Sequence, residues 1–295
     1  MNKLPSETRV QILNLLCEGT SMRAISRLTG VSINTVSKLL KDAGEFCIKF
    51  HDERVRNVSS QRIQVDEIWS FVYAKQSNRE TAKAAPMDAG DVWTWTAIDA
   101  DTKLIATWFV GDRSSASARV FIGDLKARMA NRMQLTSDGL GSYLKAVEQV
   151  FGDDVDYAVL DKLYGRSAQP ASPERRYSPA ICVGAKRKEM IGNPDPAHVS
   201  TSFAERQNLT MRMHMRRFTR LTNAFSKKFE NHCHMIAIYT VWYNWVRVHK
   251  TLRVTPCMAA KVTDRVWDWS DIVALMDAEA PKPGPRGPYK KAAAI

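Results

Sequence analysis

The sequence predicts an α/β protein in which a mixed β-sheet is flanked by helices and preceded by a small all-helical domain. Between residues 61 and 160, three strands, a helix, a strand, a second helix and a further strand follow one another, an order typical of α/β proteins. Residues 6–44 instead carry three short helical patterns separated by glycine. With 295 residues, 44% of them hydrophobic, the chain can build one large core and a small one.

The three N-terminal helices are placed by their capping residues. Ser21 can cap the second helix, whose Leu28 is expected to face inward. Gly30 permits a tight turn, and Ser32 or Asn34 can cap the third helix. A helix, a glycine turn and a further helix at this size predict a helix-turn-helix.

The last helix of a helix-turn-helix enters the major groove of DNA. Its outward side chains in this sequence are polar or basic: Asn34, Thr35, Lys38 and Lys41. We therefore predict a DNA-binding domain over residues 1–45, followed by a charged helical linker over residues 46–62. The alternative is a plain three-helix bundle that contacts protein.

The charge of the chain favours a polyanionic partner. The 43 Lys and Arg residues exceed the 31 Asp and Glu residues by 12, which indicates nucleic acid before other partners. The sequence begins without an apolar signal core, and no run approaches the roughly 18 apolar residues of a membrane span. Five scattered cysteines without a CxxC pair fit a reducing compartment, so we expect a cytoplasmic protein without a membrane partner.

Two adjacent carboxylates interrupt an apolar strand. Residues 63–72, IQVDEIWSFV, alternate as a strand does, with Asp66 and Glu67 in the middle. A buried carboxylate is unfavourable unless a charge meets it, so the pair marks a sheet rim or a site. Because neighbouring strand residues point to opposite faces, Glu67 is expected to form a salt bridge rather than to bind a metal with Asp66.

Two further strands and a helix are expected next along the chain. Residues 91–111 read as two strands joined by a turn, in which Asp99 and Asp101 have a backbone role. Residues 114–129 read as an amphipathic helix, with Val120, Phe121, Ile122 and Leu125 inside and Lys126 and Arg128 outside.

Asp138 ends the next strand, residues 132–138, and is followed by glycine. A right-handed crossover can place this strand parallel to the first, so that Asp138 lies near Asp66 at a comparable depth. Glu205 begins a basic helix further along the chain. Asp66, Asp138 and Glu205 can then converge on a pair of divalent ions, for which carboxylate oxygens suit Mg²⁺.

The helix that contains Glu205 is strongly basic. Between residues 206 and 228 it has basic residues and no acidic one: Arg206, Arg212, Arg216, Arg217, Arg220, Lys227 and Lys228. Asn208 and Arg212 share the face of Glu205, so this row could grip a phosphate beside the ions. The alternative is a solvated basic face on which Glu205 pairs with a capping Ser202.

Three segments resemble the catalytic blocks of insertion-sequence-one-type bacterial transposases: DEIWSFV, TSDGLGSY and SFAERQNLTMRMHMRRFTRLTNAFSKK. The segment YNWVRVHKTLRVTP is similar to the closing segment of many transposases of the DDE class, so the resemblance covers roughly residues 63–256. It implies a ribonuclease-H-like catalytic core with Asp66, Asp138 and Glu205 as the catalytic, metal-binding triad. It gives Asn208 and Arg212 supporting or DNA-contacting roles.

The resemblance defines the expected organisation and activity. A catalytic domain spans residues 63–266, with an insertion at about residues 161–199, and a short helix and a disordered basic tail occupy residues 267–295. It implies a bacterial, nucleoid-associated enzyme that uses two Mg²⁺ or Mn²⁺ ions. This enzyme binds transposon ends and target DNA, cleaves and transfers strands, and works as a homodimer or higher oligomer. Arg206, Arg216 and Arg217 are further DNA-contact candidates.

Two other functions stay open at this point. One is a DNA-binding regulator whose nuclease-like domain is inactive, and the other is a metal-dependent nuclease without strand transfer. Many members of the family carry a cysteine-rich zinc segment before the helix-turn-helix. Only Cys17 and Cys47 lie in that region here, at a spacing that does not suit zinc.

Three histidines are given lesser roles. His232 and His234 flank a cysteine on a helix, where side chains two residues apart diverge, so a core role is expected rather than zinc binding. His249 could contact phosphate or act as a cation at the end of a helix.

Overall fold

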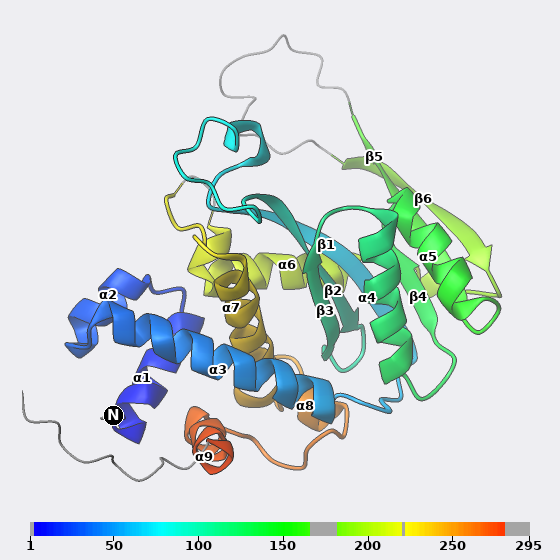
Figure 1. Cartoon of the computed structure of the whole chain (residues 1–295). Coiled ribbons are helices and arrows are strands. Elements are labelled where there is room, and N and C mark those ends of the chain that lie inside the picture. The colour runs from blue at the N-terminus through cyan, green and yellow to red at the C-terminus, as the bar shows by residue number, and fades with distance from the viewer. Residues whose placement is uncertain (1–2, 166–181, 220–221, 281–295) are drawn as a thin grey trace, which may run out of the picture.

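The computed structural model describes residues 3–165, 182–219 and 222–280. Its centre is a six-stranded sheet with the order β3-β2-β1-β4-β5-β6 (Figure 1). The strands are β1 (Arg62–Val72), β2 (Gly90–Asp99), β3 (Ile105–Gly111), β4 (Gln134–Ser137), β5 (Asp156–Tyr164) and β6 (Cys182–Ile191).

The sheet is mixed in direction. β1, β2 and β3 form an antiparallel meander, whereas β4 is parallel to β1 and β5 is parallel to β4. β6, which lies within the expected insertion at residues 161–199, returns antiparallel to β5 and extends the sheet. This mixed α/β order, with helices between the parallel strands, is compatible with a ribonuclease-H-like fold.

Helices cover both faces of the sheet. On one face lie α4 (Ser115–Arg128) and α5 (Gly141–Phe151), and on the other lie α6 (Ser202–His214) and α7 (Phe229–Val241) (Figure 1). Trp95, Phe121 and Tyr143 are fully buried in the core between the sheet and α4 and α5. Because both faces are covered, β1 buries residues of both faces, among them the polar Gln64 and Ser70 besides its acidic pair.

The N-terminal helices are α1 (Ser6–Cys17), α2 (Met22–Thr29) and α3 (Ile33–Arg54). The predicted turn is present, since Ser21 caps α2 through the amide of Ala24 at 3.2 Å and Gly30 has a φ of +67°. Leu28 is 65% exposed, so the prediction that it faces inward was wrong. The end of α2 lies at the surface and leaves that side chain uncovered.

α3 continues as one helix through residues 46–54, where the helical linker was expected. It packs along α7, and a side chain at Gly44 would bring its Cβ within 2.3 Å of the Cβ of His234. Cys17 and Cys47 are buried in the core that these helices share with α7. The N-terminal helices therefore contact the rest of the protein closely (Figure 1).

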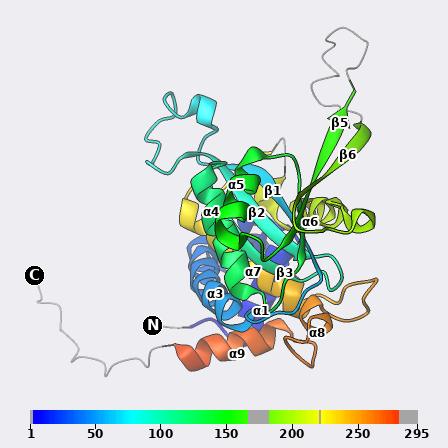
Figure 2. The same ribbon diagram turned by 90° about the vertical axis from the view of Figure 1, so that its right-hand side faces the viewer.

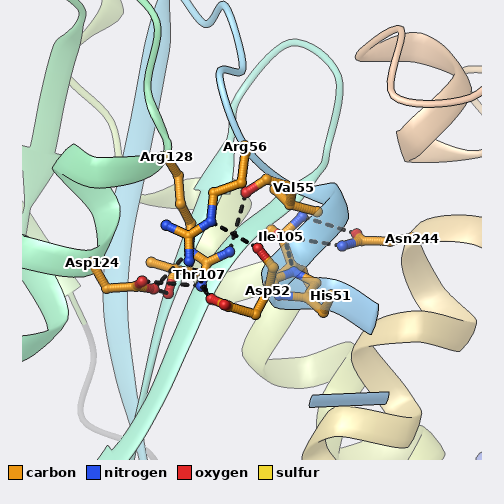
Figure 3. Close-up of polar contacts among 9 residues, drawn as sticks. All are labelled: His51, Asp52, Val55, Arg56, Ile105, Thr107, Asp124, Arg128 and Asn244. Atoms are coloured by element: carbon orange, nitrogen blue, oxygen red, sulfur yellow. Dashed lines mark hydrogen bonds and ion pairs between the residues drawn. The ribbon is translucent and has the colours of Figure 1, made fainter. Parts of the chain in front are cut away.

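The exposed and buried sides of α4 differ from the sequence expectation at two positions. Val120 is 56% exposed, although it was expected inside, and Arg128 is 5% exposed, although it was expected outside. The Arg128 guanidinium enters the interior because two aspartates meet it there, Asp52 of α3 and Asp124 of α4, each at 2.7 Å (Figure 3).

Arg128 belongs to a polar network that joins α3 to the sheet. We call this network the α3 junction: His51, Asp52, Val55, Arg56, Ile105, Thr107, Asp124, Arg128 and Asn244 (Figure 3). Arg128 also donates to the carbonyl of Val55 at 3.1 Å, and the Thr107 hydroxyl donates to Asp124. Nearby, Asn244 exchanges two 3.0 Å hydrogen bonds with the backbone of Ile105, whose carbonyl also contacts His51 at 3.2 Å.

The remaining described elements close the side of the protein next to α1. α7 continues into a wide helical turn, Trp242–Val246, followed by α8 (Pro256–Ala259) and α9 (Trp269–Glu279), which packs on α1. The expected basic tail at residues 281–295 and residues 166–181 of the expected insertion lie outside the described residues. The paired strands β5 and β6 extend away from the body of the protein (Figure 2).

Of the helices that the structure describes, none combines the length and the apolar character that crossing a bilayer requires.

Candidate metal centre

The parallel pairing of β1 and β4 places Asp66 and Asp138 at the same depth. Gln64 pairs with Thr136, so the residue two positions further on each strand is an aspartate. β4 ends at Ser137, and Asp138 begins the turn, where its Oδ1 accepts the amide of Leu140 at 3.0 Å. The expected proximity of the two aspartates is therefore present in the fold.

Glu67 joins these two aspartates. Ligand oxygens of Asp66, Glu67 and Asp138 all lie within 4.8 Å of one another, and we call these three residues the carboxylate cluster. The Glu67 side chain is 1% exposed, accepts a 2.8 Å hydrogen bond from Arg113 Nε and accepts a 3.1 Å bond from the Tyr143 hydroxyl. The expected salt bridge of Glu67 is thus present, but it does not keep Glu67 away from Asp66.

Burial and mutual repulsion raise the pKa values of two carboxylates of the cluster. Burial, followed by the charges of Glu67 and Asp138, raises the pKa of Asp66 to about 7. Burial and the charge of Asp138 also raise the pKa of Glu67, despite the opposing effect of Arg113. Three carboxylates with one arginine carry an excess of negative charge, which a divalent cation would neutralise.

Asn208 completes one side of the cluster. Its Nδ2 donates to Asp66 Oδ2 at 2.8 Å, and the residue is 6% exposed. Its Oδ1 is buried without a hydrogen-bond partner. A buried amide oxygen without a partner is unfavourable in a folded protein unless a ligand meets it. Oxygen atoms of carboxylates and an amide form a donor set that suits Mg²⁺ or Mn²⁺, so these residues fit such an ion.

Glu205 lies outside the cluster. It is in the first turn of α6, where its carboxylate accepts a 2.6 Å hydrogen bond from Thr201 and pairs with Lys162 of β5. It is still near enough for its charge to raise the pKa of Asp66. Thr201, rather than the expected Ser202, is the residue that precedes α6 and pairs with Glu205.

The DNA-contact candidates on α3 lie on the first half of that helix. Asn34, Lys38 and Lys41 are exposed, and Thr35 is half-buried. Lys38 pairs with Asp42, and Lys41 lies 3.6 Å from a carboxylate oxygen of Glu45. The second half of the helix is occupied by its contacts with α7 and the α3 junction.

The candidates on and after α6 differ in exposure. Arg206 and Arg216 are exposed, Arg212 is half-buried and Asn208 is buried. Arg217 turns inward, where its Nη1 donates to the Ser226 hydroxyl at 2.9 Å and to the carbonyl of Asn231. Burial lowers the pKa of Arg217 to about 10. Arg220 lies outside the described residues.

His232 has the core role that was expected of it. His232 is fully buried between the hydroxyls of Ser70 and Ser226, and burial followed by the charge of Arg217 lowers its pKa to about 3.

The backbone amides of Asp101 and Thr102 donate to Asp99, which is the turn role expected of that aspartate.

Sequence reasoning did not identify Arg113 or Tyr143 as part of the site. Arg113 lies outside the quoted segments, and Tyr143 ends TSDGLGSY but was given no role there; both reach Glu67 from segments that follow other strands. The unexpected feature is therefore the environment of Glu67, which depends on three separate segments of the chain.

No protein-family model matches the chain, and none of the curated proteins matches it. Among solved structures, the chain is similar to a piggyBac transposase in a synaptic complex with hairpin DNA, with a TM-score of 0.29 and 10% sequence identity. The match covers 76% of this chain and 55% of the other, so the chain spans just over half of that transposase. At this TM-score the likeness is weak and defines no family.

Proposed function

We propose that the chain is a DNA transposase of an insertion sequence, which binds terminal inverted repeats and cleaves and transfers DNA strands in a metal-dependent reaction. The observation that carries this proposal is the meeting of Asp66 and Glu67, in the middle of β1, with Asp138, directly after the end of β4. The net charge of +12 supports a DNA substrate, and the sheet order supports a ribonuclease-H-like core.

Asp66 and Asp138 would hold the divalent ions, with Glu205 as the third residue of the triad. Two such ions, Mg²⁺ or Mn²⁺, when bound, activate a water or a 3′-hydroxyl and stabilise the leaving oxygen of a phosphodiester. Asn208 fixes the orientation of Asp66 through its 2.8 Å hydrogen bond. Because Asp66 has a raised pKa, it holds a proton more readily than an exposed aspartate and must release it to bind a cation.

Glu205 reaches this arrangement only when its carboxylate leaves Lys162. The ion pair is partly exposed, with 27% of the Lys162 side chain and 43% of the Glu205 side chain accessible, so exchange with solvent or phosphate is inexpensive. Lys162 could then contact a DNA phosphate. This exchange would couple the arrival of DNA to the completion of the triad.

DNA contacts are proposed at two places. On α3, Asn34, Thr35, Lys38 and Lys41 would read the inverted repeat, since the first half of the helix presents them. Beside the carboxylate cluster, Arg206, Arg212 and Arg216 would contact the backbone of the strand that is cut. Arg217 is less suited to this role because its guanidinium bonds within the protein. Joining two ends requires at least a homodimer.

A nicking assay tests the proposal. A plasmid carrying the DNA that flanks the reading frame is incubated with the protein and Mg²⁺ or Mn²⁺, and the ends are mapped. We expect cuts at the element's ends by the wild type. Asp66→Asn, Asp138→Asn and Glu205→Gln should each reduce cleavage by at least about 100-fold, while DNA binding measured by gel shift persists.

The outcomes separate the candidate functions. Binding without cleavage by the wild type under all these conditions would support a regulator and contradict the proposal. Cleavage without joining of the free 3′-hydroxyl to target DNA would indicate a nuclease. If all three variants cut like the wild type, the assignment of the catalytic residues is wrong.

A further inference from the structure

Glu67 occupies an unusual position among the acidic residues of the chain. It follows Asp66 directly on β1, and successive side chains on a strand point to opposite faces. Its carboxylate nevertheless lies within 4.8 Å of a ligand oxygen of Asp66 and of Asp138. β4 ends one residue before Asp138, so at this depth β1 is paired with β2 but has no strand beside it on the β4 side, and both side chains can reach the space there.

Glu67 is held firmly in that space. Arg113 binds one carboxylate oxygen, and the Tyr143 hydroxyl binds the other. Each carboxylate oxygen has two lone pairs; Nε and Nη2 of Arg113 both meet Oε1, whereas Oε2 accepts from Tyr143 and keeps a lone pair for a cation. Arg113 supplies one positive charge, which balances one of the three carboxylates and leaves two negative charges that match one divalent ion.

A second observation at the same place indicates a ligand. The Asn208 amide is anchored on Asp66 by its Nδ2, and its buried Oδ1 has no partner. Neighbouring carboxylates do not by themselves indicate a bound ion. A buried amide oxygen without a hydrogen-bond donor is unfavourable, and a cation bound by the adjacent carboxylates would satisfy it.

The geometry points to Glu67 as a third metal-binding carboxylate, which together with Asp66 and Asp138 forms a cation site on β1 and β4 that does not need Glu205. This inference rests on the proposed function, because it extends the metal centre proposed there. In this arrangement Arg113 and Tyr143 are positioning residues that hold the Glu67 carboxylate. One ion then binds before DNA arrives, and Glu205 adds to the site after it leaves Lys162.

Calorimetric titration of the full chain with Mn²⁺, without DNA, tests this inference. We expect one ion per chain and at least tenfold weaker binding in Glu67→Gln, comparable to Asp138→Asn. Glu205→Gln should bind Mn²⁺ within about twofold of the wild type. Glu148→Gln, an exposed glutamate on α5, is the matched control and should bind like the wild type.

A second variant separates metal binding from a merely structural role of Glu67. Arg113→Gln keeps the carboxylate and removes its ion-pair partner, so Mn²⁺ should bind as tightly as in the wild type or more tightly. If Glu67 were only the ion-pair partner of Arg113, Glu67→Gln and Arg113→Gln would both lower the melting temperature, and neither would change the affinity for Mn²⁺. That result would overturn the inference, as would loss of Mn²⁺ binding in Glu205→Gln.

Failure of this inference can be distinguished from failure of the proposed function. If the wild type binds Mn²⁺ through Glu67 but does not cut DNA, the proposed transposase activity is contradicted and the inferred metal site is still supported. If the wild type cuts DNA and Glu67→Gln binds Mn²⁺ as tightly as the wild type, Glu67 is not a metal ligand and the proposed activity is still supported.

Discussion

The α3 junction and the carboxylate cluster are both partly buried groups of polar side chains beside the same sheet, yet their charges are balanced differently. In the junction, Asp52 and Asp124 meet Arg128 and Arg56, and the hydrogen bonds of the Arg128 guanidinium are directed at acceptors. In the cluster, three carboxylates meet one arginine, and Asn208 keeps an unsatisfied oxygen.

The pKa values of the two regions show the same difference. Burial acts to raise the pKa of Asp124, but hydrogen bonds from Arg128 and Thr107 outweigh it, and the pKa lies below its ordinary value. Burial and neighbouring carboxylates raise that of Asp66 to about 7. A network with satisfied partners stabilises the fold, whereas one with excess charge of one sign is suited to bind a counter-ion.

The largest expected effect separates activity from stability. Asp138→Asn removes one charge from the cluster, so DNA cleavage should fall by at least about 100-fold while the free energy of unfolding stays the same or rises. Cleavage assays and urea denaturation of the same preparations check both parts. Loss of stability by more than about 1 kcal/mol would indicate that the cluster supports the fold, as the junction does.

The junction should respond in the opposite way. Arg128→Met leaves Asp52, Asp124 and the Val55 carbonyl without their buried donor, so the free energy of unfolding should fall by roughly 2–4 kcal/mol. Arg56→Met is the control. Its side chain is 38% exposed, so the change should stay below about 1 kcal/mol in urea denaturation. Equal effects of both variants would contradict this account of the junction.

The pH dependence of stability should differ in sign between the two regions. The folded metal-free protein holds the Asp66 proton between about pH 4 and 7, where an unfolded chain releases it, so this residue lowers stability as pH rises. Burial and the charge of Arg128 lower the pKa of His51 to about 4, so this residue lowers stability as pH falls from 6.5 to 4.

Urea denaturation across pH 4–7 checks both signs. Asp66→Asn removes the proton that the folded state holds, so the free energy of unfolding should rise more steeply with pH than in the wild type. His51→Gln removes the imidazole that takes up a proton on unfolding, so the free energy of unfolding should rise less with pH than in the wild type, or fall. Parallel curves for the three proteins would show that neither residue titrates as described.

The smallest expected effects come from two matched hydroxyl deletions. Thr107→Val removes a donor to Asp124, and Tyr143→Phe removes a donor to Glu67, so each should lower the free energy of unfolding by about 1 kcal/mol. Only Tyr143→Phe should also change the affinity for Mn²⁺, measured by calorimetry. A change in Mn²⁺ affinity in Thr107→Val would contradict the separation of the two regions.

Much of the fold was predictable because it follows local patterns. Alternation predicted the first three strands, and a glycine after Asp138 marked the end of β4. The approach of Asp66 to Asp138 followed from one assumption, the parallel pairing of two strands, which the register confirms.

The environment of single side chains was not predictable. Arg128 was expected outside because a basic residue at the end of an amphipathic helix is usually solvated, and its burial depends on Asp52, 76 residues away in the chain. The role of Glu67 depends on Arg113 and Tyr143 in the same manner. Such partners come from tertiary packing and leave no local signal.

Thermal unfolding with Mn²⁺ and with a chelator tests most directly the claim that the carboxylate cluster is a cation site. A ligand that binds only the folded state at 100 times its dissociation constant stabilises it by about 2.7 kcal/mol. We predict that saturating Mn²⁺ raises the melting temperature of the wild type and of Arg128→Met by similar amounts, and that Asp66→Asn and Asp138→Asn lose most of this shift. An unchanged melting temperature in the wild type, or an equal shift in all four proteins, would contradict the account.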